Sequence, residues 1–95
     1  MNVSIIPQRK IGAIYFYLST HFPGCAITHA EDSDREHLIF TVACADSTYT
    51  ATLHFRLLDD RNADDIQTIL HLYQLARVLR RSATGEIFLS GLDPL

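Results

Sequence analysis

Apolar and polar residues alternate along residues 37–57, and this alternation predicts two β-strands joined by a tight turn. Successive side chains of a strand point to opposite faces, so one face of the hairpin is apolar and the other is mixed. Threonines, His54 and Arg56 occupy the mixed face. The apolar face carries Leu38, Phe40, Val42, Cys44, Tyr49, Ala51, Leu53, Phe55 and Leu57.

The turn decides which residues oppose each other across this hairpin. With Asp46 and Ser47 as the central turn residues, Phe40 lies opposite Leu53. A slip of one residue would mix the two faces, so the pattern favours this register. Asp-Ser is not the Asn-Gly type that a two-residue turn prefers, and a longer loop is the alternative.

A helical spacing precedes the hairpin. Apolar residues recur every three or four positions, which predicts a helix that ends at Phe22-Pro23-Gly24. Residues 25–30 then form a short strand, and the charged residues 31–36 form a loop that sets Ala30 opposite His37. The helical stripe consists of Ile11, Ile14, Tyr15, Leu18 and Phe22.

A second helix is predicted over residues 63–81, after the third strand ends at Leu58. Asn62 or an aspartate before it can cap this helix, and its closing arginines suit the negative end of the helix dipole. Its apolar arc covers roughly 220°, against the ~100° that a core-facing stripe needs. A fourth strand follows at residues 86–90.

These elements predict a single α+β domain over residues 1–95. The order is helix, three-stranded antiparallel meander, helix, strand. The apolar face of the hairpin has to be covered, and two amphipathic helices on that one face give a two-layer sandwich.

Composition narrows the class of protein. The 47% hydrophobic content is typical of a globular chain, and no apolar run reaches the roughly 18–20 residues that cross a bilayer. The first residues lack the pattern of a secretory signal, so we expect a small acidic cytoplasmic protein without a membrane partner. A formal net charge of −3 disfavours binding to nucleic acid, which requires a basic face.

The order helix–strand–strand–strand–helix resembles that of double-stranded RNA-binding domains. Those domains bring lysines to the phosphates at the start of their second helix, but residues 61–65 here read Arg-Asn-Ala-Asp-Asp. Type III secretion chaperones begin with a similar order and are small, acidic and dimeric. Their further strands are missing from this chain, so neither resemblance is a family assignment.

Two cysteines, Cys25 and Cys44, are expected to be free thiols in the core of a protein from a reducing compartment. His21, Cys25 and His29 stand four residues apart, but this spacing matches no zinc-finger pattern and no fourth ligand is evident. We therefore expect no metal and no cofactor. No nucleophile motif is present, which disfavours an enzyme.

Two surfaces remain as candidate sites. Leu72, Leu75 and Leu79 lie outside the core arc of the second helix. Either the C-terminal strand and tail cover them or another chain does, and burial against another chain is favoured. The sequence therefore predicts a non-enzymatic interaction module, adaptor, chaperone-like or regulatory, that forms a homodimer or binds a client protein.

The alternative is a ligand or anion site, binding or catalytic, on the mixed face of the sheet. His37 lies opposite Arg56 in the predicted register, with His54 beside them. Arginine is suited to bidentate contacts with carboxylates. A solvated sheet face without a ligand explains the same residues.

Overall fold

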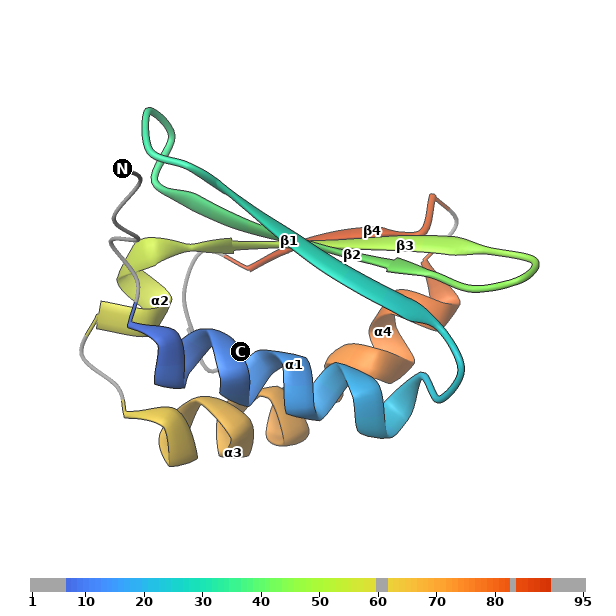
Figure 1. Cartoon of the computed structure of the whole chain (residues 1–95), viewed down its shortest axis with the longest axis horizontal. Coiled ribbons are helices and arrows are strands. Elements are labelled where there is room, and N and C mark those ends of the chain that lie inside the picture. The colour runs from blue at the N-terminus through green and yellow to red at the C-terminus, as the bar shows by residue number, and fades with distance from the viewer. Residues whose placement is uncertain (1–6, 60–61, 83, 90–95) are drawn as a thin grey trace.

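The computed structural model describes residues 7–59, 62–82 and 84–89. The four strands of this part form one mixed sheet in the order β1-β2-β3-β4, in which only the β3–β4 pair is parallel. Figure 1 shows the helices on one side of the sheet, so the two-layer α+β fold is confirmed. The elements are α1 (Gln8–His21), β1 (Ala26–Asp32), β2 (His37–Ala43), β3 (Thr48–His54), α2 (Phe55–Asp59), α3 (Ala63–Tyr73), α4 (Leu75–Arg81) and β4 (Glu86–Leu89).

The first helix, α1, buries its predicted stripe against the rest of the chain. Only Tyr15 of that stripe stays half-buried, where its hydroxyl bonds to the Nδ1 atom of His29 at 2.7 Å. Gly24, with a positive φ of 82°, lies in the turn that leads from α1 to β1. The buried side chains of α1 and its C-cap are Ile11, Ala13, Ile14, Tyr17, Leu18 and Phe22.

The β2–β3 hairpin has the predicted faces but a different register. Phe40 pairs with Ala51, two residues away from the predicted partner. A shift of two residues leaves each side chain on its own face, so the hydrophobic pattern cannot detect it. Residues 44–47 form a longer loop in place of the two-residue turn, and the Cys44 N–H donates to the Ser47 carbonyl at 2.8 Å.

The third strand is shorter than the alternation predicts. It ends at His54, and the next residues form the short helix α2. Phe55, Leu57 and Leu58 are all buried there. A strand would send Leu57 and Leu58 to opposite faces, whereas one helical turn keeps all three side chains toward the core.

The first hairpin is also shifted by two residues, and this shift brings the cysteines together. β1 continues to Asp32, and Ile27 pairs with Val42. Two positions further in this register, Cys25 lies opposite Cys44, and the two form a disulfide with their Cα atoms 4.5 Å apart. The prediction of two free thiols is therefore wrong.

The second predicted helix is two helices. α3 ends at Tyr73 and α4 begins at Leu75, because Gln74 between them has left-handed backbone angles of φ 57° and ψ 47°. Asn62 caps α3 as predicted and accepts from the Asp65 N–H at 2.8 Å. α3 packs against α1, whereas α4 turns toward β3 and β4. Of these two helices only α4 contacts the sheet directly, and α1 contacts it at β1.

The break between α3 and α4 is stabilised from α1. The first N–H groups of a helix have no partner within that helix. Here the backbone N–H of Ala76, in the first turn of α4, donates to the buried hydroxyl of Tyr17 at 3.0 Å. One side chain of α1 thus stabilises the direction that α4 takes.

The fourth strand, β4, completes the sheet beside β3. The Thr50 N–H donates to the carbonyl of Gly85 at 2.7 Å, and Gly85 has a positive φ of 73°. A Cβ atom at this glycine would lie 2.8 Å from the Thr48 carbonyl oxygen, so only glycine allows this close approach. The predicted fourth strand is confirmed at Glu86–Leu89, and its last predicted residue, Ser90, lies outside the described residues.

Candidate functional site

A groove of about 500 Å³ lies on the outer surface of the helices, between α1 and α3. Phe16 borders it with 63% of its surface exposed, although the core-facing stripe of α1 accounts for the other large apolar residues of that helix. The groove is lined by Phe16, Tyr17, Thr20, His21, Gln67, Thr68 and His71.

The periodicity of the two helices explains how these residues meet. Phe16 and Thr20 are four residues apart and therefore share a side of α1, away from the buried Ile14 and Leu18. Gln67, Thr68 and His71 repeat the same spacing on α3, which packs against α1. The groove consequently has an aromatic wall on one helix and a polar wall on the other.

The leucines predicted to bind a partner do not form this surface. Leu75 and Leu79 are 0% exposed in the core, and the side chain of Leu72 lies outside the described part of the structure. Their expected exposure assumed one continuous helix. The left-handed Gln74 redirects α4 and sends both leucines inward, so the exposed strip predicted for them is wrong.

A second hollow, of about 250 Å³, adjoins the groove at the break between α3 and α4. It shares three lining residues with the groove and adds two arginines of α4. None of its lining residues is acidic. They are Tyr17, His21, His71, Gln74, Ala76, Arg77 and Arg80.

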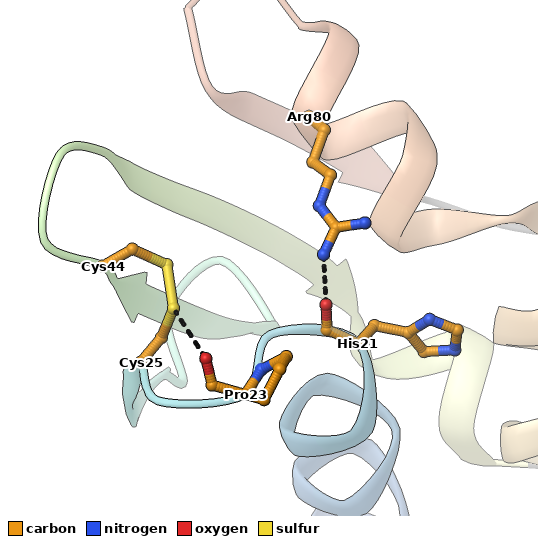
Figure 2. Close-up of a disulfide and its surroundings, with 5 residues drawn as sticks. All are labelled: His21, Pro23, Cys25, Cys44 and Arg80. Carbon is orange, nitrogen blue, oxygen red and sulfur yellow. Dashed lines mark hydrogen bonds between the residues drawn. A yellow bond between two sulfur atoms is a disulfide. The ribbon is translucent and has the colours of Figure 1, made fainter.

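Hydrogen bonds and one ring contact orient the two arginines that line this hollow. Figure 2 shows the guanidinium of Arg80 directed at the backbone carbonyl of His21, to which it donates a hydrogen bond. The same guanidinium lies over the ring of Phe22, 4.7 Å from its centroid. Arg77 donates to the side-chain oxygen of Gln74 at 3.2 Å.

The disulfide lies close to Arg80 and the end of α1 (Figure 2). Cys25 follows the Pro23-Gly24 turn at the end of α1, and Cys44 opens the loop between β2 and β3 (Figure 2). The bond therefore ties the end of α1 to the β2–β3 hairpin. Phe22 of the same turn packs against Tyr49 of β3, with ring centroids 5.3 Å apart.

The mixed face of the sheet brings together only part of the predicted ligand site. His37 pairs with His54, with ring centroids 5.8 Å apart. Arg56 belongs to α2 and not to the strand, so the predicted pairing of His37 with Arg56 is wrong. The backbone N–H of Arg56 donates to Nδ1 of His54 at 3.1 Å, while Nε2 of His54 lies 3.8 Å from the carboxylate of Glu36.

Phe88 of β4 adds an aromatic side chain to this face. It is 50% exposed, and its ring centroid lies 4.9 Å from that of His37. The outward backbone groups of Glu86 on the same strand are already occupied, because its carbonyl accepts from the Ser82 hydroxyl and its N–H donates to the Thr84 hydroxyl. These bonds limit further strand pairing at the start of this sheet edge.

Comparison with protein-family models, curated proteins and solved structures gives no match for this chain.

Over 7–59, 62–82 and 84–89, no three histidine, cysteine, aspartate or glutamate side chains gather in a way that could hold a metal ion. No helix in these ranges is long and apolar enough to cross a membrane.

Sequence reasoning missed both exposed phenylalanines. Phe16 and Phe88 each lie outside the apolar face of their own element. An aromatic residue at a position that the core pattern assigns to solvent is the signal that could have identified them.

Proposed function

We propose that the chain is a small non-enzymatic protein-interaction module, of the adaptor, chaperone-like or regulatory kind. It acts through homodimerisation or through client binding on the side of the second predicted helix. The contact surface is the groove between α1 and α3, because Leu75 and Leu79 are buried. The observation that carries the proposal is the 63% exposure of Phe16 at the border of this groove.

Phe16 has the chemistry of an interface anchor. Aromatic side chains are enriched at the centres of protein interfaces, where polar groups form the rim. Full burial of one phenylalanine contributes roughly 1.5–3 kcal/mol. Thr20, Gln67 and His71 surround the anchor with groups that can exchange water for hydrogen bonds to a partner.

The lining of the groove supports binding more than catalysis. It offers the hydroxyls of Tyr17 and Thr20 and the imidazoles of His21 and His71. Nucleophilic catalysis commonly uses a third group that orients the base. No carboxylate lines the groove among the described residues, so the imidazoles lack the usual orienting partner.

Light scattering coupled to size exclusion tests this proposal on the untagged chain. Over a concentration series, we expect the mass to rise toward twice 10.7 kDa. Phe16→Asp should give a folded monomer, because it replaces the exposed apolar anchor of the contact with a charge. Phe88→Asp is the matched control, since it changes the other exposed phenylalanine on the sheet and should leave the dimer intact.

The light-scattering results distinguish homodimerisation from client binding. A dimer that survives Phe16→Asp would place the interface outside the groove. A monomer at every concentration would contradict homodimerisation and leave the client-binding form. A photo-crosslinking phenylalanine analogue at position 16 should then capture a defined protein, whereas the same analogue at position 88 should not.

A second candidate function uses the mixed sheet face as a ligand or anion site. The observation in its favour is the adjacency of His37, His54 and Phe88, which gives two imidazoles next to an exposed aromatic ring. NMR titration of the histidine rings with and without an added anion tests it. Unchanged ring signals for His37 and His54 would contradict this function.

A further inference from the structure

The hollow at the break between α3 and α4 concentrates positive charge in an acidic protein. The chain has a formal net charge of −3, yet this hollow is lined by Arg77, Arg80 and two histidines, with no acidic lining residue. Arginines at the end of a helix compensate its dipole, which explains their presence in α4. The dipole does not explain why α4 directs two of them into the same hollow as His21.

Both arginines keep hydrogen-bond donors available. The guanidinium of Arg80 uses one nitrogen on the His21 carbonyl, and that of Arg77 uses one on Gln74. A guanidinium carries five N–H donors in a planar fork, so each can still contact an anion. The contacts with His21 and with the ring of Phe22 reduce the rotational freedom of Arg80, which lowers the entropic cost of binding.

The wall of the hollow supplies another donor. The hydroxyl oxygen of Tyr17 accepts from the Ala76 N–H, and no acceptor for its own hydrogen is found among the described residues. Tyr17 is only 6% exposed, and its ring lies against that of His21 with centroids 4.4 Å apart. A hydroxyl hydrogen on this wall can be donated to an oxygen of a bound anion.

The hollow continues into the groove between α1 and α3, which has an aromatic wall on α1. Tyr17, His21 and His71 line both it and the groove that Phe16 borders. The groove, of about 500 Å³, is of the size of a small-molecule site, and the hollow adds about 250 Å³ at its end. A ligand that spans them meets cationic donors at one end and aromatic side chains at the other.

We propose that this hollow binds a small organic carboxylate with an apolar body. The carboxylate contacts Arg77 and Arg80, and the apolar body lies along Tyr17 toward Phe16. Bidentate arginine–carboxylate pairing supplies orientation, and burial of the apolar body supplies affinity. This site goes beyond the proposed interaction function, because it needs no second protein chain.

Titration with phenylacetate at low ionic strength tests the site, with backbone amide NMR shifts as the readout. We expect saturable shifts confined to residues that line the groove and the hollow, with a Kd on the order of 1 mM for so small a probe. Acetate, which has the charge without the apolar body, should bind at least about tenfold more weakly. Raising the ionic strength should weaken binding of phenylacetate.

Single substitutions test the arginines. Arg77→Gln should weaken phenylacetate at least about tenfold. Arg81→Gln is the control, because it removes an exposed arginine of the same helical turn that does not line the hollow. Arg77 is bonded only to a neighbour on the surface, so its substitution should leave the fold unchanged.

Three results would overturn the proposal: no saturable shift up to about 10 mM phenylacetate, equal weakening by Arg77→Gln and Arg81→Gln, or equal binding of acetate and phenylacetate. The titrations are run at a protein concentration at which light scattering shows a monomer, because a dimer formed through Phe16 would cover the groove. Failure of the titrations there would reject the carboxylate site, and dimerisation through Phe16 at higher concentration would leave the proposed interaction function standing.

Discussion

The hydroxyl of Tyr17 on α1 accepts a hydrogen bond from the backbone N–H of Ala76 on α4, at 3.0 Å and away from solvent. These residues are 59 positions apart in the sequence. The bond satisfies an N–H that a continuous helix would have paired with its own backbone. It therefore stabilises the break at Gln74, from which the buried position of Leu75 and Leu79 and the shape of the second hollow both follow.

Tyr17→Phe should destabilise the fold by about 1–3 kcal/mol, because the buried Ala76 N–H loses its acceptor while the ring is kept. Chemical denaturation measures this change. Tyr15→Phe is the matched control, since its hydroxyl bonds to His29 at an exposed site and its loss should cost less than about 1 kcal/mol. Equal costs for the two variants would contradict a special role for Tyr17.

Gln74→Gly should stabilise the protein by about 0.5–1 kcal/mol. Gln74 has a φ of 57°, which glycine adopts without the steric cost that a side chain imposes. The same change at Gln67, inside α3, should destabilise by about 1 kcal/mol, because glycine is a poor helix former. Denaturation midpoints compare the pair, and a loss of stability in Gln74→Gly would argue that residues 63–81 form one continuous helix.

The disulfide should leave no free thiol in the purified protein, and a thiol-reactive dye measures this before and after reduction. A cross-link that spans 19 positions is worth about 3 kcal/mol in the chain-entropy treatment. Reduction should therefore lower the free energy of unfolding by about that amount. The double variant Cys25→Ala with Cys44→Ala should match the reduced protein, and two reactive thiols in the untreated protein would show that the bond is absent.

The hydrophobic pattern predicted which face of β2 and of β3 is buried, but it could not establish which residues are neighbours across the sheet. Phe40 and Ala51 share the core face in the predicted and in the observed register, because the two differ by two residues. Only the length of the loop between β2 and β3 distinguishes the two registers. The same ambiguity hid the disulfide, since Cys25 meets Cys44 in the observed register alone.

The helix break carried no sequence signal of the usual kind. Neither glycine nor proline lies between residues 63 and 81, and glutamine is a good helix former. The break is stabilised by a hydroxyl from α1, a tertiary contact that local pattern cannot report. For this reason the sequence pattern assigns Leu75 and Leu79 to positions outside the core. The groove beside Phe16 also depends on tertiary packing, that of α3 against α1.

Gly12 and Gly85 lie in opposite environments, so substitution by alanine should change the stability in opposite directions. Gly12 lies on the exposed side of α1, where a Cβ atom would meet nothing within 4 Å, so Gly12→Ala should stabilise the protein by about 0.5–1 kcal/mol. Gly85→Ala should have the opposite sign and cost more than about 2 kcal/mol. Its φ is 73°, which alone costs an alanine about 1–2 kcal/mol, and its Cβ atom would lie 2.8 Å from the Thr48 carbonyl oxygen.

Thermal and chemical denaturation of both variants measure this difference in sign. Amide exchange at Thr50 adds a local readout, because the Thr50 N–H donates to the carbonyl of Gly85 and should exchange faster in Gly85→Ala. If Gly85→Ala were as stable as Gly12→Ala and kept the Thr50 amide protected, β4 would not pair with β3 in the register described. The exposed Phe88, which depends on that register, would then have to be placed anew.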